Sequence, residues 1–166
     1  YSFIITNFKK KGVIYPLVNY INMKKVLTII LILLSTLGFS QEIEEKIVGL
    51  WMEYSKAFEY KDYDKISEHF RYPVVFHHKS NPTILNNKRE LIKAYKNSRE
   101  TIIQKGYKYS LLEKRELIKI SEIIVILDAS YSRFNNSYEK IYSGRGLYSY
   151  EIKNGDWKMS AVKTVK

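Results

Sequence analysis

The sequence predicts an α+β domain in which helices cover the concave face of a curved, mostly antiparallel sheet. Two helical segments open the domain, two short strands and a third helix follow, and four long strands end it. The turn sequence Asn154-Gly155 lies between the last two strands, and Asn-Gly is a strong signal for a tight hairpin. A curved sheet of this kind needs a cover, which the first and third helices can provide.

The first helix is predicted over residues 42–60. Its apolar residues recur at spacings of three and four, which places them on one face of a helix. These residues are Ile43, Ile47, Leu50, Trp51, Tyr54 and Phe58. This face is expected to pack against the sheet.

A short second helix and the first strand come next. Asp62 can cap the helix, which carries Ile66 and Phe70. Pro73 is expected to end it and to hold Tyr72 in an extended conformation. The stretch PVVFHH that follows is typical of a strand.

The third helix is predicted from signals at both of its ends. The turn residues SNP and a brief strand over residues 83–85 precede it. Asn87, with Glu90 three residues later, resembles a capping box, and Gly106 fits the end of the helix. Its apolar face carries Leu91, Tyr95 and Ile102.

The rest of the chain is predicted to be strands that form an antiparallel meander. Apolar, aromatic and β-branched residues dominate four segments separated by turn residues. The segments are 107–120, 122–134, 138–153 and 156–165.

A secretory signal peptide is predicted over residues 23–40. Two lysines follow Met23, and residues 26–34 are apolar. The apolar run, which reaches Phe39 with polar interruptions, is short for a membrane span of about 20 residues. Contact with a membrane is therefore expected only if this segment stays uncleaved and acts as an anchor.

The expected cleavage site lies between Ser40 and Gln41. Gly38 and Ser40 place small residues at the two positions that such a site requires. Residues 41–166 would then form a single secreted or periplasmic domain. Residues 1–22 are expected to be an upstream extension outside the mature protein, or else part of the folded chain.

Composition limits the classes of function. With 166 residues and 45% hydrophobic residues, the chain can form one domain with a core. The absence of cysteine excludes disulfides, thiolate metal sites and a cysteine nucleophile. The net charge is +11, but beyond residue 40 most lysines lie close to glutamates or aspartates, and such mixed signs are typical of a solvated surface. A nucleic-acid partner would need a one-sided basic stripe, so none is expected.

The order of segments over residues 42–166 resembles the SnoaL-like or ketosteroid-isomerase-like superfamily. That superfamily also contains nuclear transport factor two and has a cystatin-like fold. The matching stretches are FEYKDYDKISEHF, YPVVFHH, ILNNKRELIKAY and YSRFNNSYEKIYSGRGLYSYEIKNGDWKMSAV. The resemblance implies a cone with an interior pocket between sheet and helices. Its members include isomerases, dehydratases, cyclases and binding modules, so the fold alone does not choose an activity.

Two adjacent histidines lie at the end of the first predicted strand. Alternation places His78 with Tyr72 and Phe76 on one face, and His77 on the other. Because the two side chains point apart, they are poorly placed to bind one metal ion, and no metal site is expected. One of them is expected to face the cavity as a general base, a ligand contact or a hydrogen-bonded strand-end residue.

Polar residues on the central long strand are further site candidates. Tyr131 and Arg133 follow an apolar run on one face and are expected to line the cavity. Arg133 could clamp an anion or a carboxylate, or pair with a nearby glutamate. Asp128 lies on the other face, where it is paired, at a subunit interface, or perturbed in pKa and catalytic.

The expected ligand contacts are mostly aromatic. They are Trp51, Tyr54, Tyr72, Phe76, Arg133, Tyr148 and Trp157. On the next strand, Gly144 and Gly146 alternate with tyrosines, which indicates a sharp bend or room for a ligand. The GRG sequence there lies within a strand and not at a helix start, so it is not a phosphate loop, and no cofactor is expected.

Three functions remain open from the sequence. The first is a secreted or periplasmic domain that binds a small apolar or aromatic molecule. The second is an isomerase or dehydratase that uses His77 or His78 with Tyr131, or Tyr131 with Asp128. Ketosteroid isomerase uses a carboxylate base, which the first strand lacks. The third is a homodimeric interaction module that uses the outer sheet face at Ile124 and Ile126.

Overall fold

The computed structural model describes the backbone of residues 15–78, 81–103 and 106–165. Within these ranges, side chains are described at residues 25–30 and from residue 41 onward. The chain divides into two compact units, Tyr1–Glu42 and Ile43–Lys166. The expected upstream extension therefore lies partly outside the described residues, as do most side chains of the expected leader.

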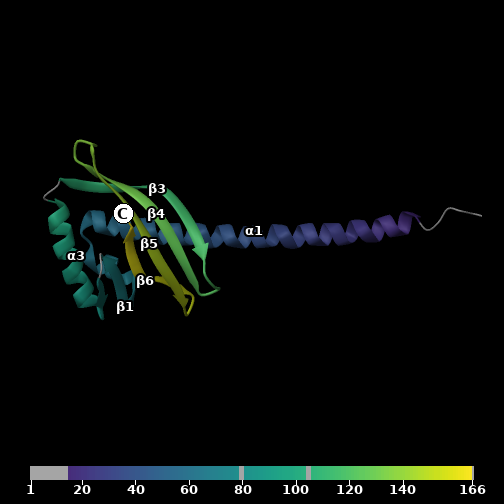
Figure 1. Cartoon of the computed structure of the whole chain (residues 1–166), viewed down its shortest axis with the longest axis horizontal. Coiled ribbons are helices and arrows are strands. Elements are labelled where there is room, and N and C mark those ends of the chain that lie inside the picture. Colours follow the sequence, from purple (N-terminus) through teal and green to yellow (C-terminus); the bar gives the residue numbers. More distant parts are fainter. Residues whose placement is uncertain (1–14, 79–80, 104–105, 166) are drawn as a thin grey trace, which may run out of the picture. The chain divides into compact units, whose positions relative to one another are not determined.

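The described elements confirm the predicted α+β class and element order. They are α1 (Tyr15–Tyr60), α2 (Tyr63–Glu68), β1 (Phe70–His78), β2 (Asn81–Leu85), α3 (Lys88–Ile103), β3 (Tyr107–Lys119), β4 (Ile124–Asn135), β5 (Lys140–Lys153) and β6 (Asp156–Val165). The described strands form one sheet in the order β2-β1-β6-β5-β4-β3. Only the β1–β6 pair among them is parallel. Figure 1 shows the long strands β3, β4 and β5 bent along their length.

Helix α1 begins at Tyr15, well before the predicted start at residue 42. Between Pro16 and Pro73 the sequence has no proline to interrupt the backbone hydrogen bonds of a helix. The predicted apolar face is confirmed in the second unit, where Ile47 and Trp51 are buried in the core.

The end of α2 differs from the prediction. Asp62 caps the helix as expected, since its Oδ1 accepts a hydrogen bond from the Lys65 amide at 3.0 Å. However, α2 ends at Glu68, and Phe70 already belongs to β1. The prediction that Pro73 ends this helix is therefore wrong.

Pairing with β6 explains why the strand starts before the proline. The Met159 amide donates a hydrogen bond to the His69 carbonyl at 2.8 Å, and Phe70 lies opposite Met159. The register between the two strands then shifts before Val75. Pro73 falls inside this irregular stretch, where its lack of an amide proton costs no regular ladder bond.

Both ends of α3 and the last hairpin follow the sequence signals. The Glu90 amide donates to Asn87 Oδ1 at 3.0 Å, and the Gly106 amide donates to the Ile103 carbonyl at 2.7 Å. Gly106 has a φ of 78°, which favours glycine. Asn154 and Gly155 both have positive φ, as a tight hairpin turn requires.

Tyrosine rings pack directly over two glycines of β5, Gly144 and Gly146. A Cβ on Gly146 would lie 2.8 Å from Cε2 of Tyr148, whose ring leans back over that glycine. A Cβ on Gly144 would lie 2.8 Å from Cζ of Tyr131. Space that the sequence left open for a bend or a ligand is therefore occupied by aromatic side chains.

We predict that Gly146→Ala lowers the free energy of unfolding by about 1–2 kcal/mol. The Tyr148 ring is buried against Trp51 and must shift to make room for an added methyl group, and overpacking of this kind is destabilising. The matched control is Gly49→Ala in α1, where a Cβ would meet no atom within 4 Å. That change should raise stability by about 0.5–1 kcal/mol, because glycine disfavours a helix interior. Urea denaturation measures the free energy of unfolding of both variants. A Gly146→Ala protein as stable as the Gly49→Ala protein would contradict the packing described.

Candidate functional site

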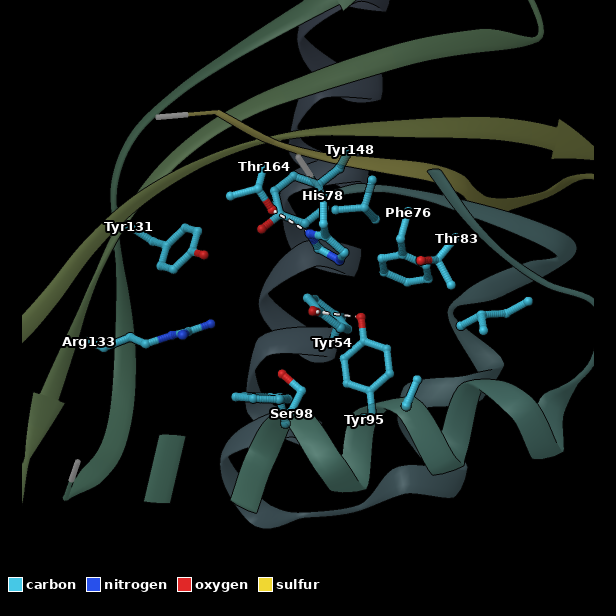
Figure 2. Close-up of a pocket in the computed structure, with 14 residues that line it drawn as sticks. Tyr54, Phe76, His78, Thr83, Tyr95, Ser98, Tyr131, Arg133, Tyr148 and Thr164 are labelled. Carbon is cyan, nitrogen blue, oxygen red and sulfur yellow. Dashed lines mark hydrogen bonds between the residues drawn. The ribbon is translucent and has the colours of Figure 1, made fainter. Parts of the chain in front are cut away.

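A cavity of about 420 Å³ lies in the second unit, lined by α1, α3 and every strand except β3. Its aromatic lining consists of Tyr54, Phe58, Phe76, Tyr95, Tyr131 and Tyr148. Its polar lining consists of His78, Thr83, Ser98, Arg133 and Thr164. Leu85, Ala94 and Val162 complete the wall. Figure 2 shows the labelled members of this set converging on one space from opposite elements.

His78 is the histidine of β1 that lines the cavity. Its Nδ1 lies 3.2 Å from the Thr164 hydroxyl of β6, and its ring stacks on Phe76 with centroids 5.7 Å apart. His77 is exposed and does not line the cavity. Strand alternation thus separates the two side chains, and only His78 is available to a molecule in the cavity.

Two tyrosine hydroxyls meet at the centre of the wall. The hydroxyls of Tyr54 on α1 and Tyr95 on α3 lie 3.0 Å apart (Figure 2). Burial raises the pKa of Tyr54 to about 12 and raises that of Tyr95 well above its ordinary value. Both hydroxyls therefore stay protonated at neutral pH. Because their mutual hydrogen bond uses one of two protons, the pair can donate the other to a ligand.

Arg133 brings the positive charge of the site into a cage of aromatic rings. Its guanidinium carbon lies 5.2 Å from the Tyr142 ring, 5.3 Å from Tyr131, 5.7 Å from Phe58 and 5.8 Å from Tyr107. The ring faces attract the positive charge of the guanidinium, but they accept few hydrogen bonds from its N–H groups. Its Nε is buried without a hydrogen-bond partner. The alternative of a salt bridge to glutamate is not found among the described ion pairs.

A second arginine, Arg99 of α3, shares the same rings. It is 3% exposed, and its guanidinium lies 4.5 Å from the Tyr107 ring and 5.5 Å from the Phe58 ring. Its Nε donates to the Phe58 carbonyl and its Nη2 to the Glu59 carbonyl, both at 3.2 Å. A cation at these carbonyls stabilises the C-terminal end of α1. Sequence reasoning missed this residue, although it continues the Leu91 and Tyr95 face by one more helical turn.

Asp128 lies away from the cavity. On the outer face of β4, its carboxylate accepts a bidentate hydrogen bond from Arg145 of β5, with Nε 2.8 Å from Oδ1. This contact holds the pKa of the Asp128 carboxyl below its usual range. The structure therefore does not bring Asp128 to Tyr131 or to either histidine.

Three of the expected ligand contacts do not line the cavity. Trp51 packs behind it, edge-on to Tyr148 with ring centroids 6.0 Å apart. The Tyr72 hydroxyl donates to the Ser67 carbonyl at 3.1 Å. Trp157 is buried in the core. Tyr54, Phe76, Arg133 and Tyr148 do line the cavity.

Several lining residues were not anticipated, and Tyr95 is the most informative. Its helical spacing predicted a core position, but no pattern indicated that its hydroxyl would meet that of Tyr54 from a distant helix. Thr164 reaches the cavity because β6 runs parallel to β1, a pairing that the sequence does not reveal.

Acidic side chains are absent from the described cavity lining. Within the described residues, no three His, Asp or Glu side chains come close enough to hold a metal ion. The helices, over the part of the chain with described side chains, include none long and apolar enough to span a membrane.

Comparison with known proteins identifies the family of this chain. The model of the family described as NTF2-like protein (DUF6841) matches residues 42–166. The chain belongs to this family. No curated protein matches the chain.

Solved structures show the same fold. An NTF-2 like protein of unknown function from Shewanella oneidensis is 14% identical, with a TM-score of 0.59, over 74% of this chain and 98% of that one. An NTF2-like protein with a cystatin-like fold from Novosphingobium aromaticivorans is 10% identical, with a TM-score of 0.64. The match covers 79% of this chain and 86% of that one. A putative calcium/calmodulin dependent protein kinase II association domain from Xanthomonas campestris is 10% identical, with a TM-score of 0.55, over 72% and 84%. At these identities the likeness concerns the fold alone, so function depends on the site.

Proposed function

We propose that this NTF2-like chain is exported and that its domain binds a small, largely apolar or aromatic molecule in the cavity between sheet and helices. The observation that carries the proposal is the cavity itself. Its volume of about 420 Å³ falls in the range of about 300–1,000 Å³ typical of ligand sites. Aromatic walls with a few convergent polar groups are the usual make-up of such sites.

Binding is better supported than isomerase or dehydratase chemistry. Proton abstraction needs a base within hydrogen-bond reach of the substrate, oriented by a second group. His78 is the candidate, but its partner is the Thr164 hydroxyl and no carboxylate of the described lining stands beside it. The tyrosines, kept protonated by burial, are suited to donate hydrogen bonds rather than to act as bases.

Export is proposed from the leader sequence. Residues 24–40 combine a positive start, an apolar stretch and small residues before Gln41. The buried core of the described residues is made of residues from Ile47 onward, in the second compact unit, so it contains no residue of the leader.

We predict that small aromatic or steroid compounds raise the melting temperature of the chain and that Ala94→Phe removes the effect. Ala94 lines the cavity from α3, and a phenyl ring there would fill ligand space. The matched control is Asn97→Phe, which adds the same ring at an exposed position of α3 that does not line the cavity. Thermal-shift scans on the three proteins make the comparison. No shift in the wild type, or an unchanged shift in Ala94→Phe, would overturn the proposal.

Export makes a separate prediction. Protein recovered from the periplasm or medium of a bacterial expression host should begin at Gln41, as read by intact mass. Ser40→Leu places a bulky residue next to the cut and should block processing. Exported wild-type protein that retains residues 23–40 would contradict the assignment of this segment as a cleaved leader.

A further inference from the structure

We propose that the ligand is a monoanion with an apolar body, and that its carboxylate binds the guanidinium of Arg133. This inference rests on the proposed function, because it names the chemical class that the cavity takes. Among the described lining residues, Arg133 is the only Lys or Arg, and no acidic side chain is there to pair with it.

The charge of Arg133 is poorly compensated by the protein. Removing a guanidinium from water is costly unless its N–H groups find acceptors. The described side-chain hydrogen bonds and ion pairs include none from the guanidinium of Arg133, and its buried Nε has no hydrogen-bond partner. The rings around it attract the charge but leave these donors unused.

The neighbouring arginine strengthens the need for an anion. Arg99 contacts the Phe58 and Tyr107 rings that Arg133 also contacts, so two cations share one aromatic cluster. Arg99 is bonded to the carbonyls at the end of α1. Arg133 is the member of the pair that lines the cavity. Because no acidic side chain lies in the described lining, a bound anion is the group that would neutralise it.

The distribution of groups in the cavity indicates what the anion carries. Figure 2 shows Arg133 and Tyr131 on one side, Phe76 and Thr83 on the opposite side, and the Tyr54–Tyr95 pair between them. A ligand with a charged end and an apolar or aromatic end fits this polarity. One guanidinium matches a carboxylate by a two-pronged hydrogen bond. A phosphate dianion would call for further cations or amide donors, and Arg133 is the only Lys or Arg in the described lining.

The test compares 3-phenylpropanoate with its neutral amide and with 2-phenylethylphosphonate, by calorimetric titration of the full chain. The acid should bind at least about tenfold more tightly than the amide, in line with a charge-assisted pair. In Arg133→Gln the acid and the amide should bind with about equal affinity, and the affinity for the amide should stay unchanged. Arg133→Lys keeps the charge but loses the planar fork, and should retain only part of the preference.

The matched control is Arg145→Gln, which removes an arginine from the outer face of the adjacent strand. It should leave the preference for the acid unchanged. If acid and amide bind the wild type equally, the carboxylate assignment is overturned while the proposed binding function stands. Tighter binding of the phosphonate than of the acid also overturns it. If none of the three probes binds, both proposals fail for this class of molecule.

Discussion

The concave face of the sheet must be covered, and the aromatic face of α1 provides that cover. Trp51, Tyr54 and Phe58 pack there against tyrosines of the sheet and of α3, with ring centroids about 6 Å apart. Each large ring buries much apolar area, which is the main source of stability for a chain without disulfides. Several of these rings, among them Tyr54, Phe58 and Tyr148, also line the cavity. The same aromatic residues therefore contribute both to the core and to the cavity wall.

The aromatic cluster also sets the electrostatics of the site. Phe58 and Tyr107 lie between two arginines that have different tasks. Arg99 uses helix carbonyls as acceptors and fixes the end of α1, so its charge serves the fold. Arg133 contacts ring faces, its Nε has no hydrogen-bond partner, and its side chain lines the cavity. The difference between Arg99 and the proposed ligand-binding arginine therefore depends on which acceptors the neighbouring backbone offers.

Sequence patterns predicted the fold better than the site. Period-two alternation correctly separates His78 from His77, and places Tyr131 and Arg133 together on the cavity side, because side-chain direction in a strand is a local property. The end of α2 differs from the prediction because a distant strand, β6, pairs with Phe70 and brings it into the sheet before Pro73. The pairing of Asp128 with Arg145, the burial of Arg99 and the meeting of Tyr54 with Tyr95 all join residues far apart in the chain or on different elements. Spacing within one segment contains no information about such contacts.

The proposed role of Arg133 is to hold the charged end of an apolar ligand inside the cavity. A crystal structure of the full chain with 3-(4-bromophenyl)propanoate is the decisive experiment for this role, because the anomalous signal of bromine locates the apolar end independently of the protein. We expect bromine on the Phe76 side of the cavity and a carboxylate oxygen about 3 Å from an Nη atom of Arg133. Bromine outside the cavity, or a carboxylate that turns away from Arg133 toward solvent, would contradict it.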